Sequence, residues 1–161
     1  MDDIIEINKA TYNSLADQYE EKVLLRKAFN AQVIDHFIPF IKTGKDVLDI
    51  GCAVGLDLSL FRARGFSPTG IELSSEMVSR ARKRNLGIEI IEGNFMDVSL
   101  GKKFDAVFAQ SFIHLFPKVQ ARAVFTKIRD FLKDKGCAHI TTSKSGISGE
   151  GMVEKSVYAG N

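Results

Sequence analysis

The sequence lacks the features that mark secreted, membrane-bound or nucleic-acid-binding proteins. It has only two cysteines, Cys52 and Cys137, among 161 residues, which indicates reduced thiols and not a disulfide framework. Neither cysteine belongs to a cluster with metal-ligand spacing, so no metal site is expected. The net charge of +2 is too small to indicate nucleic acid as a partner. We therefore expect a cytoplasmic protein.

Long apolar runs are also absent. No stretch approaches the length that crosses a membrane, and the acidic start Met1-Asp2-Asp3 has no apolar signal-peptide core, so no membrane partner is expected. Hydrophobic residues make up 45% and charged residues 26%, which predicts one globular domain over residues 1–161. Within it we expect a helical cap over 1–44, a core over 45–142 and a Ser/Gly-rich tail over 143–161.

The chain is organised around residues 46–57. Residues 47–50 form a short apolar run that predicts a buried strand, interrupted near its carboxyl end by Asp49. A buried carboxylate there needs a donor or a cation as its partner. Gly51 and Gly55 permit a sharp turn and a close approach to a ligand, and a helix is predicted from residue 56. Strand, glycine turn and helix together indicate a nucleotide-binding βα unit.

Two familiar nucleotide fingerprints are missing from this unit. A dinucleotide G-x-G-x-x-G starting at Gly51 requires glycine at positions 53 and 56, where the chain has Ala53 and Leu56. A P-loop requires Gly-Lys followed by Ser or Thr, and the sequence has no such run. An NAD-dependent oxidoreductase is therefore disfavoured, although it stays open as an alternative.

Residues 46–57 instead resemble motif I of the class I S-adenosylmethionine (SAM) dependent methyltransferases, usually VLDIGCGTG, with Ala53 at the middle glycine. The segment Gly70 to Ser74 is similar to the family's G-I-D-L-S, and Glu72 follows Gly51 by about 20 residues, the spacing of a ribose-binding acid. Ser74 is the predicted N-cap of the next helix.

Four more segments resemble family motifs in the same order. They are the lid pattern from Tyr12 to Tyr19, the adenine loop 93–97 with Asn94 in place of aspartate, the predicted strand 104–109 that begins with F-D-x-V, and the S-x-x-H-x-x-P loop 111–117. A turn over Lys133 to Gly136, similar to L-K-P-G-G, is expected to lead into a fifth strand at residues 137–142.

The resemblance implies where SAM binds. Asp49 orients the amino group, Glu72 binds the ribose, and Gln110 and Ser111 border the methyl donor. His114 is the candidate general base, with a structural histidine as the competing interpretation. The full set of implied cofactor-binding residues is Tyr19, Asp49, Gly51, Cys52, Ala53, Gly55, Glu72, Leu73, Asn94, Phe95, Met96, Gln110 and Ser111.

The resemblance also implies an α/β fold, a Rossmann-like doubly wound sheet with parallel strands in the order 3-2-1-4-5. The family's last antiparallel strand pair has no counterpart in this sequence, so the fifth strand is expected at a sheet edge. We expect a second copy of the chain, as a homodimer, to be one way of covering that edge. Helical stripes are predicted at Phe29, Val33, Phe37, Phe40 and Ile41, and again from Ala121 to Leu132 with Phe125 inward.

The implied activity is transfer of a methyl group from SAM to a small-molecule acceptor. One alternative is a non-catalytic module that binds SAM or mediates oligomerisation, because the absent C-terminal elements often help to form the acceptor pocket. The sequence does not identify the acceptor or its nucleophilic atom.

Overall fold

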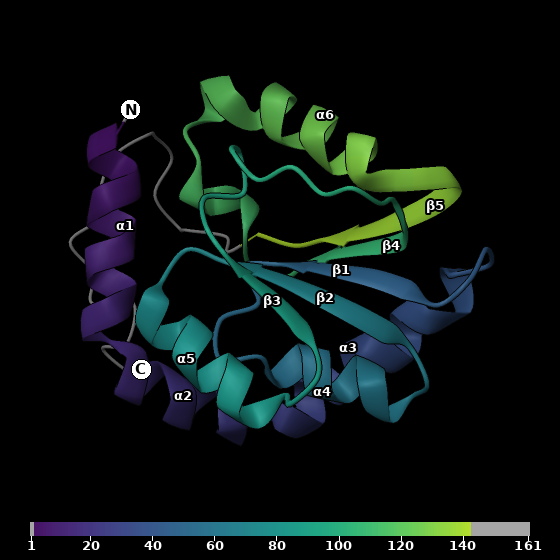
Figure 1. Ribbon diagram of the computed structural model, residues 1–161, viewed down its shortest axis with the longest axis horizontal. Helices are drawn as coiled ribbons and strands as arrows, with labels where there is room; N and C mark the ends of the chain where they lie inside the picture. Colours follow the sequence, from purple (N-terminus) through teal and green to yellow (C-terminus); the bar gives the residue numbers. More distant parts are fainter. Residues whose placement is uncertain (1, 143–161) are drawn as a thin grey trace.

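The computed structural model describes residues 2–142 and shows a five-stranded parallel sheet between two layers of helices (Figure 1). The strands lie in the order β3-β2-β1-β4-β5, which confirms the predicted doubly wound topology. Their bounds are β1 Asp46–Ile50, β2 Ser67–Glu72, β3 Glu89–Glu92, β4 Phe104–Ala109 and β5 Leu132–Ile140. The predicted tail over 143–161 lies outside the described residues.

The helices divide between the two faces of the sheet. They are α1 Asp2–Ser14, α2 Ala16–Leu25, α3 Lys27–Phe37, α4 Leu56–Ala63, α5 Ser75–Arg84 and α6 Ala121–Phe131. Helices α3, α4 and α5 cover one face and α6 covers the other, while α1 stands beside the carboxyl ends of the strands (Figure 1). Short 3-10 helices span Ile38–Phe40, Ile113–Leu115 and Lys118–Gln120.

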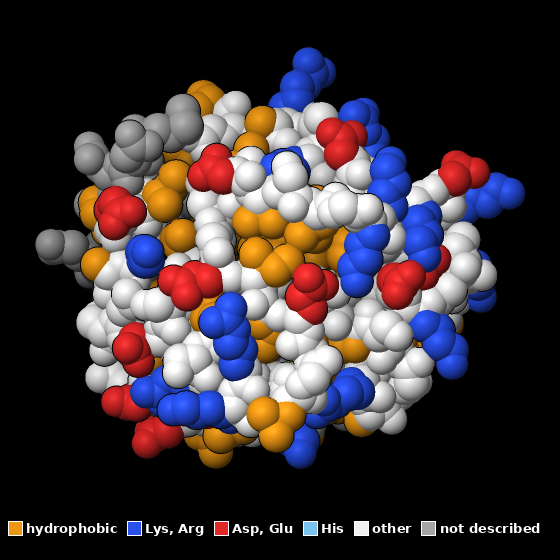
Figure 2. Space-filling model, viewed as in Figure 1, with side chains coloured by type: hydrophobic (Ala, Val, Ile, Leu, Met, Phe, Trp, Pro, Cys, Tyr) orange, Lys and Arg blue, Asp and Glu red, His pale blue; other side chains and the backbone are white. Residues whose placement is uncertain are grey.

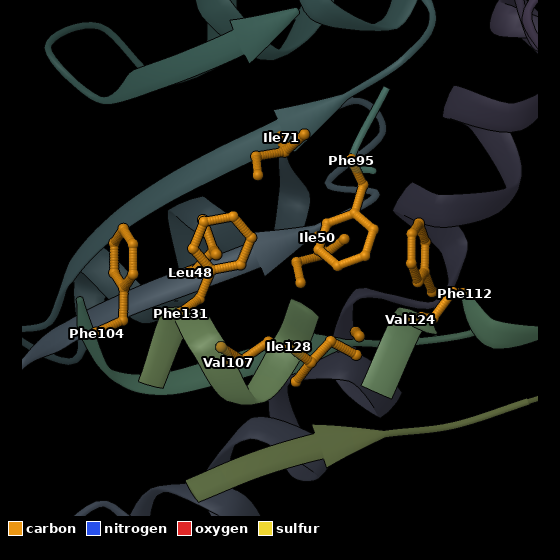
Figure 3. Packing of buried hydrophobic residues seen from close by; sticks show 11 residues of the cluster. Leu48, Ile50, Ile71, Phe95, Phe104, Val107, Phe112, Val124, Ile128 and Phe131 are labelled. Carbon is orange, nitrogen blue, oxygen red and sulfur yellow. The ribbon is translucent and has the colours of Figure 1, made fainter. Parts of the chain in front are cut away.

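An aromatic cluster fills the space between the sheet and α6 (Figure 3). Phe95 from the loop after β3 meets Phe112 edge to face with ring centroids 5.4 Å apart, and meets Phe131 of α6 at 6.0 Å. Each such pair adds about 0.5–1.5 kcal/mol beyond the area it buries. This packing fixes the loops after β3 and β4 relative to each other, and both loops line the cavity described below.

The central strands are buried on both faces, as the apolar runs predict. Every residue of β4 is buried, and in β1 only Asp46 is not. The predicted bounds of β4 are confirmed, and Ser74 caps α5 by accepting a hydrogen bond from the Met77 amide at 3.2 Å. The described residues include no helix long and apolar enough to cross a membrane.

Three local predictions are wrong. Phe29 and Phe40 are 56% and 68% exposed. Phe29 lies inside α3, but the buried face of that helix is formed by Asn30, Ile34 and Phe37. Phe40 lies beyond the end of α3, where the 3-10 turn that contains Pro39 breaks the helical phase. Phe125 on α6 is likewise exposed, because only Val124, Ile128 and Phe131 of that helix reach the core.

The predicted turn over residues 133–136 is instead part of β5. The strand begins at Leu132, and its pairing with β4 shifts register between Phe104 and Ala106. Lys135 has a φ of 60°, the left-handed conformation that such an irregularity requires. The turn signal therefore marks a bulge inside the strand.

Candidate functional site

The glycine turn after β1 is held against the end of β2. The amides of Gly51 and Cys52 both donate to the Ile71 carbonyl, at 2.9 and 3.1 Å. Gly51 and Gly55 have φ values of 72° and 75°, which glycine adopts without steric cost. A Cβ on Gly51 would lie 2.9 Å from the ring of Phe112, so glycine is required there for space as well.

Ala53 also adopts a left-handed conformation, with a φ of 46°. This is the position where the sequence departs from the family's middle glycine. The Ala53 amide donates to Glu72 Oε2 at 2.9 Å, so the turn keeps its shape although a side chain is present. An alanine in this conformation costs about 1–2 kcal/mol relative to a right-handed one.

Glu72 connects this turn to the next loop. Its second oxygen accepts a hydrogen bond from the Ser74 amide at 2.8 Å, so two backbone amides hold the carboxylate in place. The side chain is buried, and burial raises the pKa of Glu72 although these hydrogen bonds oppose the change. A carboxylate fixed at the end of β2 is placed to accept hydrogen bonds from a ligand's hydroxyl groups.

Two further carboxylates lie near Glu72. Asp49 is 3% exposed, and its Oδ2 atom accepts no hydrogen bond from any described residue. Burial raises the pKa of Asp49 well above its ordinary value, and the charges of Asp57 and Glu72 raise it further. Burial also raises the pKa of Asp57, against the hydrogen bond that Asp57 accepts from Asn30. Burial and the neighbouring carboxylates thus disfavour the charged form of Asp49 unless a cation or a hydrogen-bond donor lies beside it.

The loop after β3 folds around Asn94. Its amide donates to Asp97 Oδ2 at 2.8 Å, and its Oδ1 accepts a hydrogen bond from the Met96 amide at 3.2 Å. The side chain thus orders the loop that carries Phe95 and Met96. The Asn94 side chain is thus occupied by hydrogen bonds within its own loop. Asp97 also lines the cavity, as a polar residue that was not among the predicted site residues.

The N-terminal helices are bound to α5 by charge pairs. Arg80 contacts Asp17 and Glu20 at 2.6 Å each, and Arg84 pairs with Glu20 at 2.5 Å. Arg84 also donates to the carbonyl of Val54 in the glycine turn. The Arg84 guanidinium therefore connects the glycine turn to helix α2 of the cap.

Two tyrosines of the cap face the glycine turn. The rings of Tyr12 and Tyr19 meet edge to face with centroids 6.1 Å apart, and both pack, as Ala53 does, against a buried cluster that includes Val54. Burial raises the pKa of Tyr12, and the charge of Glu72 adds to this effect. The predicted lid therefore stands over the turn, with both phenol rings on the cavity wall.

These parts enclose a cavity of about 360 Å³ at the carboxyl ends of the strands. Ten of the predicted site residues line it: Tyr19, Gly51, Ala53, Glu72, Leu73, Asn94, Phe95, Met96, Gln110 and Ser111. None of its described lining residues is Lys, Arg or His. On the face seen in Figure 2, hydrophobic side chains gather near the centre while acidic and basic ones are interspersed around them.

Four predicted residues do not line the cavity. Asp49 lies buried behind it, Cys52 packs between the sheet and α5, and Gly55 begins α4. His114 sits in the 3-10 helix Ile113–Leu115 with its side chain exposed, and partial desolvation lowers its pKa. The structure therefore does not bring His114 together with the other residues.

Several lining residues come from parts of the chain that the motifs do not cover. Ile5 and Asn8 reach the cavity from α1, and Gln120 and Ala123 from the region where α6 begins. Phe112 and Phe116 form an aromatic wall, with ring centroids 5.1 Å apart. The sequence could have indicated these two phenylalanines, because they lie within the predicted S-x-x-H-x-x-P loop. No motif covers Ile5 and Asn8, so their lining role could not be predicted.

Comparison with known proteins agrees with this geometry. A family model described as a methyltransferase domain matches residues 47–136, more than half of the chain. The chain belongs to this methyltransferase family. The matched segment contains the glycine turn, Glu72 and the loop after β4 that carries Phe112 and Phe116. It excludes the cap that carries Tyr12 and Tyr19.

Individual relatives are distant and longer. A protein of Geobacillus sp. (strain WCH70) named as a methyltransferase is 27% identical over 141 residues, covering 78% of this chain and 55% of its own. A dTDP-3-amino-3,4,6-trideoxy-alpha-D-glucopyranose N,N-dimethyltransferase of Streptomyces venezuelae is 38% identical over 61 residues, covering 38% of this chain and 26% of its own.

Among solved structures, the SAM-bound amino pentose methyltransferase CalS10 of Micromonospora echinaspora matches with a TM-score of 0.63. It is 27% identical, and the alignment covers 71% of this chain and 51% of CalS10. The chain thus spans about half the length of the fuller relatives it matches.

Proposed function

We propose that this methyltransferase-family chain binds SAM and transfers its methyl group to a small-molecule acceptor. The observation that carries the proposal is a set of three carboxylates, buried Asp49 and Glu72 and half-buried Asp57, at a cavity whose described lining has no basic side chain. Such a site favours a cationic ligand, because a nearby positive charge offsets the desolvation of the carboxylates. SAM carries positive charge on both its sulfonium and its amino group.

The residues present fit the parts of SAM. Glu72 would accept hydrogen bonds from the ribose, and Phe95 and Met96 would contact the adenine beside Leu73. The left-handed turn at Gly51 and Ala53 would leave room for the methionine portion. Tyr12 and Tyr19 would place aromatic faces near the sulfonium, an arrangement that mildly favours a cation.

The chain's contribution to the reaction is positioning and exclusion of water. Bound SAM supplies an electrophilic methyl group, so little covalent chemistry is asked of the protein. The rigid aromatic wall of Phe112 and Phe116 restricts the space in which an acceptor can approach. Holding two reactants in line can account for roughly 7–11 kcal/mol of barrier reduction.

The acceptor is a small molecule in this proposal. The amino-sugar methyltransferases among the relatives support an amine acceptor, and the apolar wall supports one with a hydrophobic face. His114 stays a predicted general base. Its exposed position outside the cavity lining favours a role on the acceptor side over contact with the cofactor.

Calorimetric titration of the 161-residue chain with S-adenosylhomocysteine, SAM and NAD tests the proposal. We expect binding of both sulfur ligands and not of NAD, with loss of affinity in Glu72→Gln. Glu89→Gln, an exposed carboxylate on β3, is the matched control. Ligand at 100 times its dissociation constant should add about 2.7 kcal/mol of stability.

Turnover with a panel of amino sugars and aromatic amines separates an enzyme from a binding module. Methylated product that depends on Glu72 supports the enzyme. Tight binding of SAM without any product supports the non-catalytic alternative. Failure of the folded wild-type chain to bind either sulfur ligand overturns both.

A further inference from the structure

Asn30 is a buried polar side chain on a helix face that is otherwise apolar. It is 7% exposed on α3, whose other buried residues are Ile34 and Phe37. Its Nδ2 atom donates to Asp57 Oδ1 at 2.8 Å, and its Oδ1 atom accepts from Gln110 Nε2 at 3.5 Å. The side chain therefore links α4 to the loop that follows β4.

The direction of these hydrogen bonds follows from the chemistry of the three groups. An ionised Asp57 can only accept, so Asn30 must turn its NH₂ group toward Asp57. The Asn30 carbonyl oxygen then faces Gln110, so Gln110 must donate a hydrogen bond to it from its own NH₂ group. Gln110 Oε1 is consequently directed away from Asn30 as an acceptor.

This Oε1 atom has no hydrogen-bond donor among the described residues, although it is buried. The same is true of Asp49 Oδ2 on the neighbouring strand. Gln110 directly follows β4, and Asp49 pairs with Phe108 of β4 across the sheet. Two buried acceptors without donors, at adjacent strand ends beside the cavity, match a ligand group that carries several N–H donors.

We infer that Asn30 is a positioning residue that orients Gln110 to accept a hydrogen bond from the amino group of bound SAM. The inference rests on the proposed function. Asn30 acts through Gln110, since it does not line the cavity itself. It also lies outside residues 47–136, the part of the chain that the methyltransferase model matches.

A purely structural role for Asn30 makes a different prediction. Replacing Asn30 alone by leucine leaves Asp57 Oδ1 and Gln110 Nε2 without this partner, which costs about 1–3 kcal/mol of stability. A domain of ordinary stability stays folded after a loss of this size, which thermal unfolding of Asn30→Leu checks, while Gln110 loses the partner that fixes its orientation. An effect confined to ligands with an amino group separates positioning from packing.

The experiment compares two ligands in wild type and Asn30→Leu by calorimetry. S-adenosylhomocysteine carries the amino-acid portion, and 5′-methylthioadenosine keeps the adenosine and thioether but lacks it. We expect Asn30→Leu to weaken S-adenosylhomocysteine binding about tenfold and to leave methylthioadenosine binding within about twofold. Gln32→Leu, exposed on the same helix, should change neither.

A double-mutant cycle with Gln110→Ala gives a second readout. If Asn30 works through Gln110, adding Asn30→Leu to Gln110→Ala should cause less than about a twofold further loss. Equal losses for both ligands, or fully additive losses in the double variant, overturn the inference and leave the proposed function standing. A wild-type chain that binds neither ligand overturns both.

Discussion

Asp49 and Asp105 are buried aspartates on adjacent strands of one sheet, yet their surroundings are opposite. Asp105 lies near the amino end of β4, where Oδ2 accepts from the Asp46 amide at 2.9 Å and from Lys133 at 3.0 Å. Asp49 lies near the carboxyl end of β1, where Oδ2 has no donor among the described residues. Asp105 Oδ1 also lacks a hydrogen-bond donor among the described residues, but the fold gives this carboxylate a backbone amide and a Lys133 cation at Oδ2. At Asp49 Oδ2 the described residues supply neither, and we propose that a ligand does.

The pKa values differ in the same direction. Burial raises the pKa of Asp105, but the hydrogen bonds from Asp46, Lys133 and Thr43 outweigh it and bring the pKa below the ordinary value. Burial raises the pKa of Asp49, and neighbouring negative charges add to the rise. A doubly wound sheet thus uses one end for stability and the other for binding, and the two aspartates report on each.

The largest expected effect is the loss of stability in Asp105→Ala. The substitution leaves the Asp46 amide without its acceptor, removes one partner of Lys133 and opens a cavity beside Gly44. We expect about 3 kcal/mol less free energy of unfolding in urea. The affinity of the folded protein for S-adenosylhomocysteine should stay within about twofold.

The control for this variant is Asp130→Ala. Asp130 pairs with Arg129, but both side chains are more than half exposed, so we expect a loss under about 0.5 kcal/mol. A loss below about 1 kcal/mol in Asp105→Ala would show that the buried pair contributes no more than a surface pair.

Asp49→Asn is expected to raise stability and to weaken ligand binding, the reverse of Asp105→Ala. The amide has the same shape but no charge, so the folded state no longer carries a carboxylate without a partner at Oδ2. We expect a gain of about 1 kcal/mol in the free energy of unfolding. Binding of S-adenosylhomocysteine should weaken at least about tenfold, because the ligand's ammonium loses a charged acceptor.

Calorimetry and urea unfolding of the same Asp49→Asn sample measure both quantities. Asp130→Asn, which removes one charge from an exposed site, controls for the change in net charge. Lower stability together with unchanged affinity would contradict the assignment of Asp49 to the ligand.

The two aspartates should also respond to pH on opposite sides of their ordinary pKa of 3.8. Because the pKa of Asp49 is raised on folding, its contribution is most favourable when protonated and is lost as pH rises above 3.8. Because the pKa of Asp105 is lowered, its contribution is present above 3.8 and is lost as pH falls through the folded pKa.

Urea unfolding between pH 3 and pH 7 tests this difference. The advantage of Asp49→Asn over wild type should grow by about 1 kcal/mol from pH 4 toward neutrality. The deficit of Asp105→Ala should stay constant from pH 7 to pH 4 and shrink only below it. Parallel pH profiles for the two variants would show that the carboxylates do not differ in this way.

The sequence predicted the ligand end of the sheet better than the parts that close it. Glu72 and the glycine turn are close in sequence, so their spacing alone places the acid at the turn. The contribution of Ile5 and Asn8 from α1 depends on how the cap packs, which no local pattern encodes. Phe40 failed as a core residue because a helical stripe does not show where the helix ends, and Phe29 failed because α3 buries the face of Asn30, Ile34 and Phe37 instead.

Ala53 was only partly predictable. The sequence showed that alanine replaces the family's glycine, but not which backbone conformation this alanine adopts. The structure gives it a φ of 46°. Ala53→Gly removes about 1–2 kcal/mol of left-handed strain and adds about 0.5–1 kcal/mol of chain entropy on unfolding. We expect a net gain of about 0.5 kcal/mol, or roughly 1–2 °C in melting temperature.

The matched control is Ala10→Gly on the exposed side of α1, where the same substitution in a helix should cost about 1 kcal/mol. Opposite signs for the two Ala→Gly variants are the expected result by thermal unfolding. Destabilisation of Ala53→Gly would mean that the Ala53 methyl, which packs against the same buried cluster as Tyr12 and Tyr19, contributes more than the strain costs. In that case alanine at this position stabilises the closed cap, and the departure from glycine supports the ligand end of the sheet.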